Sequence, residues 1–430
     1  MNLQDFPRPS DGSRRGIHWS ASVFHPGGSS LNWWINELLD MNIKWVKLLD
    51  DGSGSSKQPC QKMLDNDIIP IVRLYRHRPN PGHLDDREKR TIAELISLGV
   101  RYFESNNEPN LEVEWKDGEW QAGGRPKLVM EHWLQDANAI VEMGGYPALP
   151  ALAQCAHHGE SGSIPWYIKA FAWLDENAHD TAQDLFSNGA WIAVHNAVLN
   201  HCYKDHENEW HFEYPDDPIC QEDQPGKTIM QDDNSLIGYR VPAKLLQEHF
   251  GLQVPVISTE GGIFAPSGGW QQWDSRYPGY DYYGHAERIV AMFEWLRVNA
   301  EDYFFAMCPW LIANERMGHI DRAWTEDAWY RMDYELAVIP AIKAMGPEPA
   351  PPPVLPLERT LRNASWNRRG LAYNPGAAFP SHAREHNLGS PLTPEFDVNW
   401  EGKAYRVQGF TGAIIYAQVG DWSAIQSLPW

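Results

Sequence analysis

RYFESNNEPN, residues 101–110, begins as an aromatic strand-like run and ends abruptly in a polar tip. Asn107, Glu108 and Pro109 terminate the run, so an amide and a carboxylate stand at the carboxyl end of the predicted strand. A carboxylate in this position has a chemical role only if a second one meets it in space. The best partner lies in VPVISTEGG, residues 254–262, where Glu260 also follows an apolar strand-like run.

Strand-like and helix-like segments alternate on both sides of this stretch. The predicted strands are 16–22, 45–52, 68–79, 101–110, 146–155, 190–200, 254–262 and 302–314. The predicted helices are 31–42, 58–64, 87–99, 126–143, 164–186, 241–251, 285–300 and 325–345. Strict βα alternation predicts an α/β fold, a (β/α)8 or TIM barrel. An open doubly wound sheet is the alternative, but no glycine-rich phosphate loop follows the first strand.

Loop lengths favour the barrel independently. Connections from helix to strand are minimal, whereas three connections from strand to helix are long, at 111–125, 201–235 and 263–284. In a barrel the long set gathers at one face, where the chemistry occurs. The aromatic residues in these loops are Trp115, Trp120, Tyr203, Trp210, Phe212, Tyr214, Trp270, Trp273, Tyr277, Tyr280, Tyr282 and Tyr283. We expect them to border a binding cleft; an aromatic-rich core is the alternative.

The composition changes sharply after the last predicted helix. Residues 1–345 form the predicted barrel, and the proline-rich run at 346–357 is expected to be a stiff linker. Residues 358–430 are then a small separate module, with a predicted helix at 383–396 and strand signals at 403–410 and 412–422.

Bulk properties exclude some partners and favour others. The 430 residues include 36 basic and 57 acidic ones, a formal charge of -21, which disfavours nucleic acid as a partner. The 21 tryptophans and 17 tyrosines are typical of a sugar-binding cleft, because pyranose rings stack on flat aromatic faces. No apolar run is long enough to span a membrane. No metal-ligand spacing is present, and we expect neither a metal nor another cofactor.

Glu108 and Glu260 are separated by 260 - 108 = 152 residues and end the predicted fourth and seventh strands. Strand ends of one barrel converge on a common mouth, so the two carboxyl groups can face each other. Cleavage of a glycosidic bond uses such a pair, about 5 to 5.5 Å apart for retention of configuration and about 6.5 to 9.5 Å for inversion. Lys47 or Arg73 would favour the ionised form of Glu260. Glu104, earlier on the fourth strand, is expected to form an internal ion pair.

The Asn-Glu-Pro tip on the fourth strand, together with Thr-Glu-Gly-Gly on the seventh, resembles the clan A retaining glycoside hydrolases. That resemblance covers roughly residues 16–345 and implies that Glu108 is the acid/base and Glu260 the nucleophile. It also implies that Asn107 binds the sugar 2-hydroxyl and that Trp310 forms the floor of the central sugar site. The expected substrate is a β-linked oligosaccharide or polysaccharide.

The chain also departs from that pattern. His195 matches the histidine of a histidine-x-tyrosine pattern on the sixth strand, but Ala197 replaces the tyrosine that would hold the nucleophile. Tyr203 and Arg73 are the candidates to orient Glu260 instead. Further predicted substrate contacts are His18, Lys47, His195 and Trp270.

Two alternative functions stay open at this stage. A carbohydrate-binding barrel without catalysis would keep the loop aromatics and would not need both glutamates. A metal-dependent barrel hydrolase would lose activity to chelators. Residues 358–430 resemble, through HNLGSPLTPEF and GFTGAIIYA, the LGFP-type repeats of bacterial envelope proteins, which implies association with cell-wall material. The start MNLQDFPRPS lacks the apolar core of a signal peptide, so we expect either a cytoplasmic protein or, slightly favoured, a secreted or envelope protein after signal removal.

Overall fold

The computed structural model describes residues 1–154, 159–322, 324–348, 356–366, 377–422 and 424–430. The chain divides into two compact units, residues 1–349 and 350–430. Most of the predicted linker at 346–357 lies outside the described residues. Among the described helices, none combines the length and apolar character that crossing a bilayer requires.

The first unit is built on one parallel sheet of eight strands in the order β1-β2-β3-β4-β5-β6-β9-β10. The strands are β1 (Gly16–His18), β2 (Trp45–Asp50), β3 (Ile69–Leu74), β4 (Tyr102–Glu104), β5 (Tyr146–Leu149), β6 (Trp191–Ala197), β9 (Val256–Gly262) and β10 (Phe304–Met307). The sheet curls until its ends meet, because Arg15 and Met307 form a parallel bridge and the Met307 amide donates to the Arg14 carbonyl at 3.1 Å. The predicted (β/α)8 barrel is therefore confirmed.

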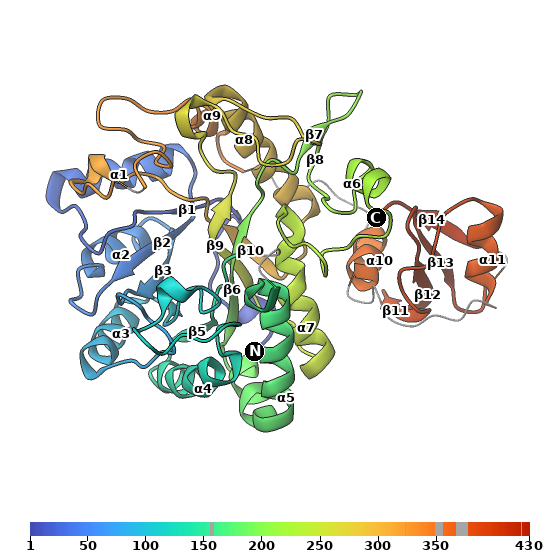
Figure 1. The fold of residues 1–430 in the computed structure, drawn as a ribbon, viewed down its shortest axis with the longest axis horizontal. Coiled ribbons are helices and arrows are strands. Elements are labelled where there is room, and N and C mark those ends of the chain that lie inside the picture. Colours follow the sequence, from blue (N-terminus) through green and yellow to red (C-terminus); the bar gives the residue numbers. More distant parts are fainter. Residues whose placement is uncertain (155–158, 323, 349–355, 367–376, 423) are drawn as a thin grey trace. The chain divides into compact units, whose positions relative to one another are not determined.

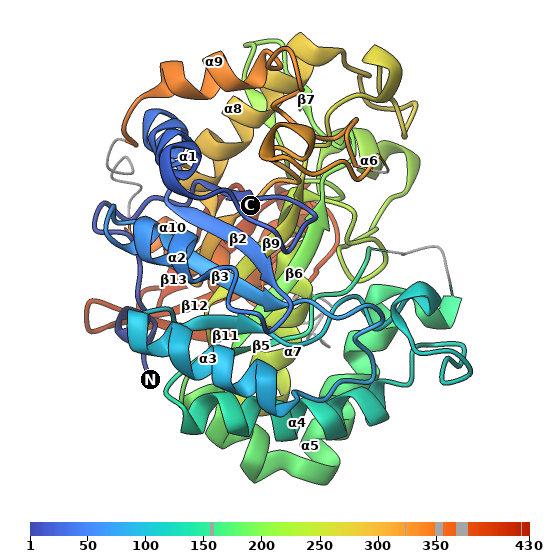
Figure 2. The same cartoon turned by 90° about the vertical axis from the view of Figure 1, so that its left-hand side faces the viewer.

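Helices separate the barrel strands along the chain and lie outside them (Figures 1 and 2). They are α1 (Gly28–Asp40), α2 (Lys57–Leu64), α3 (Asp86–Leu98), α4 (Pro126–Glu142), α5 (Ser163–Ser187), α7 (Arg240–Phe250), α8 (Tyr282–Asn299) and α9 (Val338–Met345). Local chemistry explains their ends: Asp85 caps α3 by accepting from the amides of Arg87 and Glu88, and Gly99 ends it in the left-handed conformation.

The barrel interior is arranged in two layers. The lower layer, near the amino ends of the strands, is an apolar cluster that includes Phe6, Trp45, Ile71, Tyr102, Ala148, Trp191, Ile257 and Phe305. Side chains two positions further along a strand point to the same face. Residue 47 therefore follows residue 45 into the interior, 73 follows 71, 104 follows 102, and 195 follows 193. These second positions form a polar upper layer of lysine, arginine, glutamate and histidine.

A β-bulge brings Glu260 into that upper layer. In the pairing of β6 with β9, Val194 lies opposite Ser258 but His195 lies opposite Glu260, so Thr259 is an extra residue on β9. Without the bulge, Glu260 would stand three positions after the inward-facing Ile257 and would point out of the barrel. The bulge turns it inward.

Several predicted elements differ from the structure. Most observed strands are shorter than predicted, with β4 ending at Glu104 and β10 at Met307. The helix predicted for 325–345 is wrong over most of its length, since only α9 is helical. The chain before α9 is held extended because the amides of Trp329 and Tyr330 donate to the carbonyls of Leu311 and Ile312 at 3.1 and 2.8 Å.

The second long loop also contains structure that the sequence pattern did not predict. It holds a two-stranded hairpin, β7 (Tyr203–Lys204) with β8 (Trp210–His211), and a short helix, α6 (Pro218–Asp223). The short 3-10 helices of the first unit are η1 (Leu3–Asp5), η2 (Glu112–Glu114), η3 (Gly159–Ser161), η4 (Leu236–Tyr239), η5 (Ser267–Gly269) and η6 (Glu315–Met317).

The second unit is a four-stranded antiparallel sheet with two helices. Its strands are β11 (Phe396–Trp400), β12 (Lys403–Gly409), β13 (Ile414–Gln418) and β14 (Gln426–Leu428), and its helices are α10 (Pro356–Trp366) and α11 (Ala378–Glu385). The helix predicted at 383–396 is therefore displaced, because residue 396 begins β11. The association of this unit with cell-wall material stays a prediction.

Candidate active site

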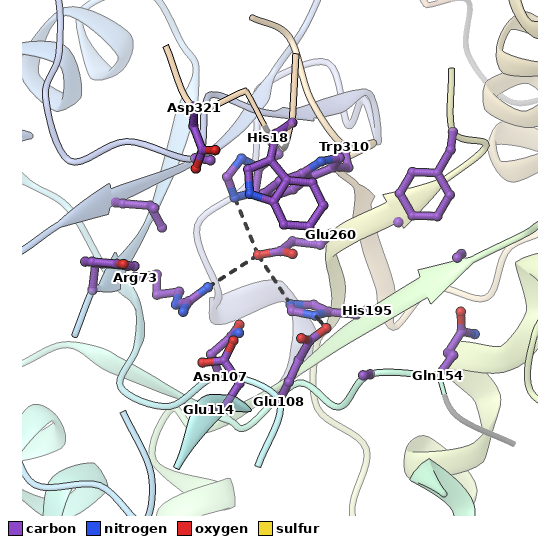
Figure 3. A pocket seen from close by; sticks show the side chains of 18 of the residues that line it. His18, Arg73, Asn107, Glu108, Glu114, Gln154, His195, Glu260, Trp310 and Asp321 are labelled. Carbon is purple, nitrogen blue, oxygen red and sulfur yellow. Dashed lines mark hydrogen bonds and ion pairs between the residues drawn. The ribbon is translucent and has the colours of Figure 1, made fainter. Parts of the chain in front are cut away.

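A pocket of about 470 Å³ opens at the carboxyl ends of the barrel strands. It is lined by residues from nearly every strand end and from several following loops (Figure 3). Seven of the residues predicted for the site line it: His18, Arg73, Asn107, Glu108, His195, Glu260 and Trp310. Strands that are far apart in the sequence thus deliver one side chain each to a shared cavity.

Glu260 lies at the centre of a ring of nitrogen atoms (Figure 3). Its Oε1 is 2.8 Å from Lys47 Nζ, 3.5 Å from His18 Nε2 and 3.5 Å from a terminal nitrogen of Arg73. His195 Nε2 lies 3.7 Å from the same oxygen. Arg73 is thus in a position to orient Glu260.

This ring controls the ionisation of Glu260. Burial acts to raise the pKa of the carboxyl group, but the charges of His195 and Lys47 and the contact with His18 outweigh it and hold the pKa well below its usual value. Burial lowers the pKa of His18 to about 4, so its imidazole is neutral near pH 7. Glu260 is therefore a carboxylate whose negative charge is balanced by His195 in the pocket and by the buried Lys47.

Lys47 also connects Glu260 to the interior of the barrel. The lysine is fully buried, and its ammonium group contacts Glu104 Oε2 at 2.9 Å as well as Glu260. The internal ion pair predicted for Glu104 is confirmed. Lys47 is not among the residues that line the pocket, so its contact is with the carboxylate rather than with the cavity.

His195 joins the two predicted catalytic carboxyl groups. Its Nδ1 is 2.8 Å from Glu108 Oε1, while its Nε2 faces Glu260. One oxygen each from Glu108 and Glu260 and one nitrogen of His195 all lie within 4.8 Å of one another. These three side chains are also the one group, within the described part of the chain, that could hold a metal ion.

The backbone at the polar tip after β4 turns sharply. Glu108 has a φ of 37°, a left-handed conformation that non-glycine residues seldom adopt and that clusters at functional sites. Its amide donates to the Ala151 carbonyl at 3.0 Å, which ties the turn to the segment after β5. Asn107 is buried, and its Oδ1 has no hydrogen-bond partner among the described residues. A buried polar atom without a hydrogen-bond partner is uncommon in folded proteins.

One wall of the pocket is aromatic. Trp310 packs against His18 with ring centroids 4.4 Å apart, and Trp324 meets Trp310 edge to face at 5.2 Å. Phe264 and Tyr75 also line the cavity. A flat aromatic wall opposite hydrogen-bonding groups matches the two kinds of surface that a sugar ring presents.

The aromatic residues predicted from the three long loops do not line this pocket. Tyr203 lies on the β7–β8 hairpin and stacks on His211, with ring centroids 5.1 Å apart. It is therefore not the residue that orients Glu260. Trp270 is 60% exposed on another loop, and Tyr277 is buried beneath the loops. Many aromatic residues of these loops pack against other residues of the loops rather than facing the pocket.

Four further lining residues carry chemistry that the sequence reasoning missed: Glu114, Gln154, Asp321 and Trp324. All four lie beyond the ends of β4, β5 and β10, without the regular spacing that identifies strand ends. The carboxylate of Glu114, six residues after Glu108, was the strongest signal available for any of them.

Comparisons with known proteins extend only to the fold. No protein-family model matches the chain, and no curated protein matches it by sequence. Among solved structures, it is similar to a β-xylosidase from Caulobacter crescentus, with a TM-score of 0.47 and 13% identity over 79% of this chain and 69% of that one. An endo-β-1,3-glucanase from Sorangium cellulosum gives a TM-score of 0.44 and 14% identity, over 78% of this chain and 100% of that one.

A broad-specificity endoglucanase from Clostridium cellulovorans is similar at a TM-score of 0.43 and 10% identity, covering 79% of this chain and 98% of that one. All three neighbours are glycoside hydrolases by name. The assignment of the barrel here rests on the strand order of the chain itself.

Proposed function

We propose that this protein is a retaining β-glycoside hydrolase that cleaves β-linked oligosaccharides or polysaccharides. The observation that carries the proposal is that Glu108 and Glu260 meet in one pocket, with one carboxyl oxygen of each within 4.8 Å of the other. An oxygen-to-oxygen distance of at most 4.8 Å is compatible with the short carboxyl separation of about 5 to 5.5 Å at which the second carboxylate attacks the sugar directly.

In the first step Glu260 is the nucleophile. Its carboxylate oxygen forms a bond to the anomeric carbon while the bond from that carbon to the leaving oxygen breaks. The electron pair of that bond stays on the leaving oxygen, which takes the proton of Glu108. The depressed pKa of Glu260 supports this role, because a nucleophile must be ionised at the start.

In the second step Glu108 acts as a base. It removes a proton from water, the water oxygen bonds to the anomeric carbon, and the bond to Glu260 breaks with its electron pair returning to the carboxylate. Two displacements restore the original configuration. His195 contacts both carboxyl groups and holds them in a fixed relation during the exchange of roles.

The remaining pocket residues have binding roles in this proposal. Trp310 stacks on the sugar ring, and the side chain of Asn107 binds its 2-hydroxyl. His18 and Arg73 border the same cavity, and Arg73 donates to another hydroxyl group of the sugar. The charge of -21 agrees with a neutral rather than a polyanionic substrate.

The variant Glu260→Ala tests the proposal. Turnover of aryl β-glycosides should be abolished, and azide should restore part of it by occupying the vacated space and attacking the anomeric carbon. The product should then be a glycosyl azide of inverted configuration. Full activity of the variant without azide would remove Glu260 from the mechanism.

A metal-dependent hydrolase is the second candidate, because Glu108, His195 and Glu260 could also hold an ion. Lys47 and Arg73 oppose it, since both already place positive charge against Glu260. Dialysis against a chelator separates the two candidates. The glycosidase should keep its activity, and a loss that added divalent metal restores would favour the metal enzyme.

A further inference from the structure

Besides Glu108 and Glu260, two carboxyl groups line the pocket without a part in the two displacements, those of Glu114 and Asp321. Glu114 ends η2, in the loop after β4, and lines the cavity half-buried. Figure 3 shows it on the same side of Glu260 as Asn107 and Glu108. The double displacement needs only two carboxyl groups, so a third one in the same cavity calls for a separate explanation.

Hydrogen bonds from Asn80 and Trp115 fix the backbone around Glu114. The fully buried Asn80 donates from its side-chain amide to the carbonyls of both Asn107 and Glu114, at 2.7 and 3.1 Å. Its backbone amide donates to the Glu114 carbonyl as well, at 3.1 Å. On the other side, Trp115 is buried and donates from its indole to the Pro109 carbonyl at 2.8 Å. Glu114 and Asn107 are thus fixed relative to each other.

The surroundings of the Glu114 carboxyl group set its protonation. Burial and the charges of Glu108 and Glu260 raise its pKa, while Arg73 and the amide of Asn107 act in the opposite direction. Arg73 is the guanidinium among the pocket-lining residues, and Glu260 already occupies it at 3.5 Å. The Glu114 carboxyl group thus lies near two other carboxyl groups, and the guanidinium nearby is already paired. Hydroxyl groups that donate hydrogen bonds to it would stabilise it.

We propose that Glu114 is a substrate-binding residue whose carboxyl group accepts hydrogen bonds from hydroxyl groups of the sugar in the pocket, beside the one that Asn107 contacts. Glu114 thereby selects sugars that carry a hydroxyl on that side of the ring. The proposal rests on the glycosidase function, which it makes more specific. A site built to bond a hydroxyl rejects analogues that lack it, because its own polar group is then left unpaired.

The test compares Glu114→Ala and Glu114→Gln with Glu112→Ala. Glu112 is a matched control, since it carries the same charge on the same 3-10 helix but is exposed and does not line the pocket. The probes are para-nitrophenyl β-glycosides of glucose, xylose and mannose, and the monodeoxy forms of the one that is hydrolysed fastest. Thermal denaturation checks that each variant is folded.

We expect Glu114→Ala to lower kcat/KM on the parent glycoside by about 10- to 100-fold, with a smaller loss for Glu114→Gln and less than twofold for Glu112→Ala. One monodeoxy glycoside should be a poor substrate of the unmodified protein and should suffer no further loss in Glu114→Ala. Unchanged kcat/KM in Glu114→Ala overturns the proposal. An equal loss on every deoxy form overturns it too, because that result means a structural role.

Calorimetric binding of the same glycosides to Glu260→Gln separates this proposal from the glycosidase function. If the unmodified protein hydrolyses none of them, the proposed function fails. Glu114 still stands as a sugar ligand if adding Glu114→Ala to Glu260→Gln weakens glycoside binding by 10-fold or more. It is overturned if binding is unchanged, or if no glycoside binds.

Discussion

The two layers of the barrel interior use the same strands for opposite purposes. On β2, β4 and β6 the lower positions hold Trp45, Tyr102 and Trp191, which pack edge to face at 5.6 Å through the tyrosine ring. Two or four positions later the same strands deliver lysine, glutamate and histidine to the pocket region. A shift of about 7 to 13 Å along a strand thus separates apolar packing from concentrated charge.

The two layers contribute differently to the stability of the fold. Buried charged groups are expensive unless they are paired, and Lys47 is paired with both Glu104 and Glu260. The aromatic lower layer buries large rings without polar demands and contributes stability. We therefore expect changes in the upper layer to alter chemistry and those in the lower layer to alter stability.

After loss of the nucleophile, Glu108→Gln should cause the largest fall in kcat. Removing the proton donor should lower kcat by about 100- to 10,000-fold on substrates with poor leaving groups. The loss should be smaller on activated aryl glycosides, whose leaving oxygen needs less protonation. Steady-state kinetics on both substrate types measures it. Equal small losses on both would show that Glu108 is not the acid.

Lys47→Met should affect both stability and the pH profile. It leaves Glu104 and Glu260 as buried carboxylates without their shared cation, which should lower the free energy of unfolding by about 3 to 5 kcal/mol. The pKa of Glu260 in the folded protein is depressed, so its charge contributes stability above its ordinary value of 4.5 and loses it as pH falls through the lower, folded value. Without Lys47 that pKa rises.

The acid limb of the kcat/KM profile should therefore move to higher pH in Lys47→Met. Denaturant unfolding at several pH values and a pH–rate profile measure the two effects. An acid limb that stays in place would mean that Glu260 does not control it.

Trp191→Ala probes the lower layer of the same strand that carries His195. We expect the free energy of unfolding to fall by about 3 to 5 kcal/mol, because a fully buried indole is lost from a packed cluster. The kcat of the folded fraction should change by less than about threefold. A large fall in kcat with little loss of stability would contradict the division of the interior into two layers.

The smallest effect is expected outside both layers, at Trp270. The residue is 60% exposed and does not line the pocket, so Trp270→Ala should leave kcat/KM on aryl glycosides within about twofold. Trp310→Ala, which removes the pocket wall, should lower it by 10-fold or more. Similar losses of kcat/KM in both variants would show that the loop aromatic residues also contact the substrate.

The sequence allows the barrel and the pairing of Glu108 with Glu260 to be predicted because both follow from counting periodic segments. Convergence of the strand ends then brings His18, Arg73 and His195 to the same pocket without further information. The bulge at Thr259 cannot be predicted in this way, because it depends on the pairing of β9 with β6.

Loop residues escape prediction for the same physical reason. Glu114 reaches the pocket on a backbone that Asn80, from a different loop, holds by hydrogen bonds. Tyr203 and Trp270 looked equally suitable, yet tertiary contacts place them elsewhere. The irregular segment before α9 is likewise set by backbone hydrogen bonds to Leu311 and Ile312 rather than by local preference.

Covalent catalysis by Glu260 can be tested by trapping the glycosyl-enzyme intermediate. The protein is incubated with activated 2-deoxy-2-fluoro β-glycosides of glucose, xylose and mannose, and its peptides are analysed by mass spectrometry. We expect one added glycosyl group, on the peptide that contains Glu260, and none in Glu260→Gln. A glycosyl group on another residue, or hydrolysis of β-glycosides that first releases the α-anomer, would contradict it.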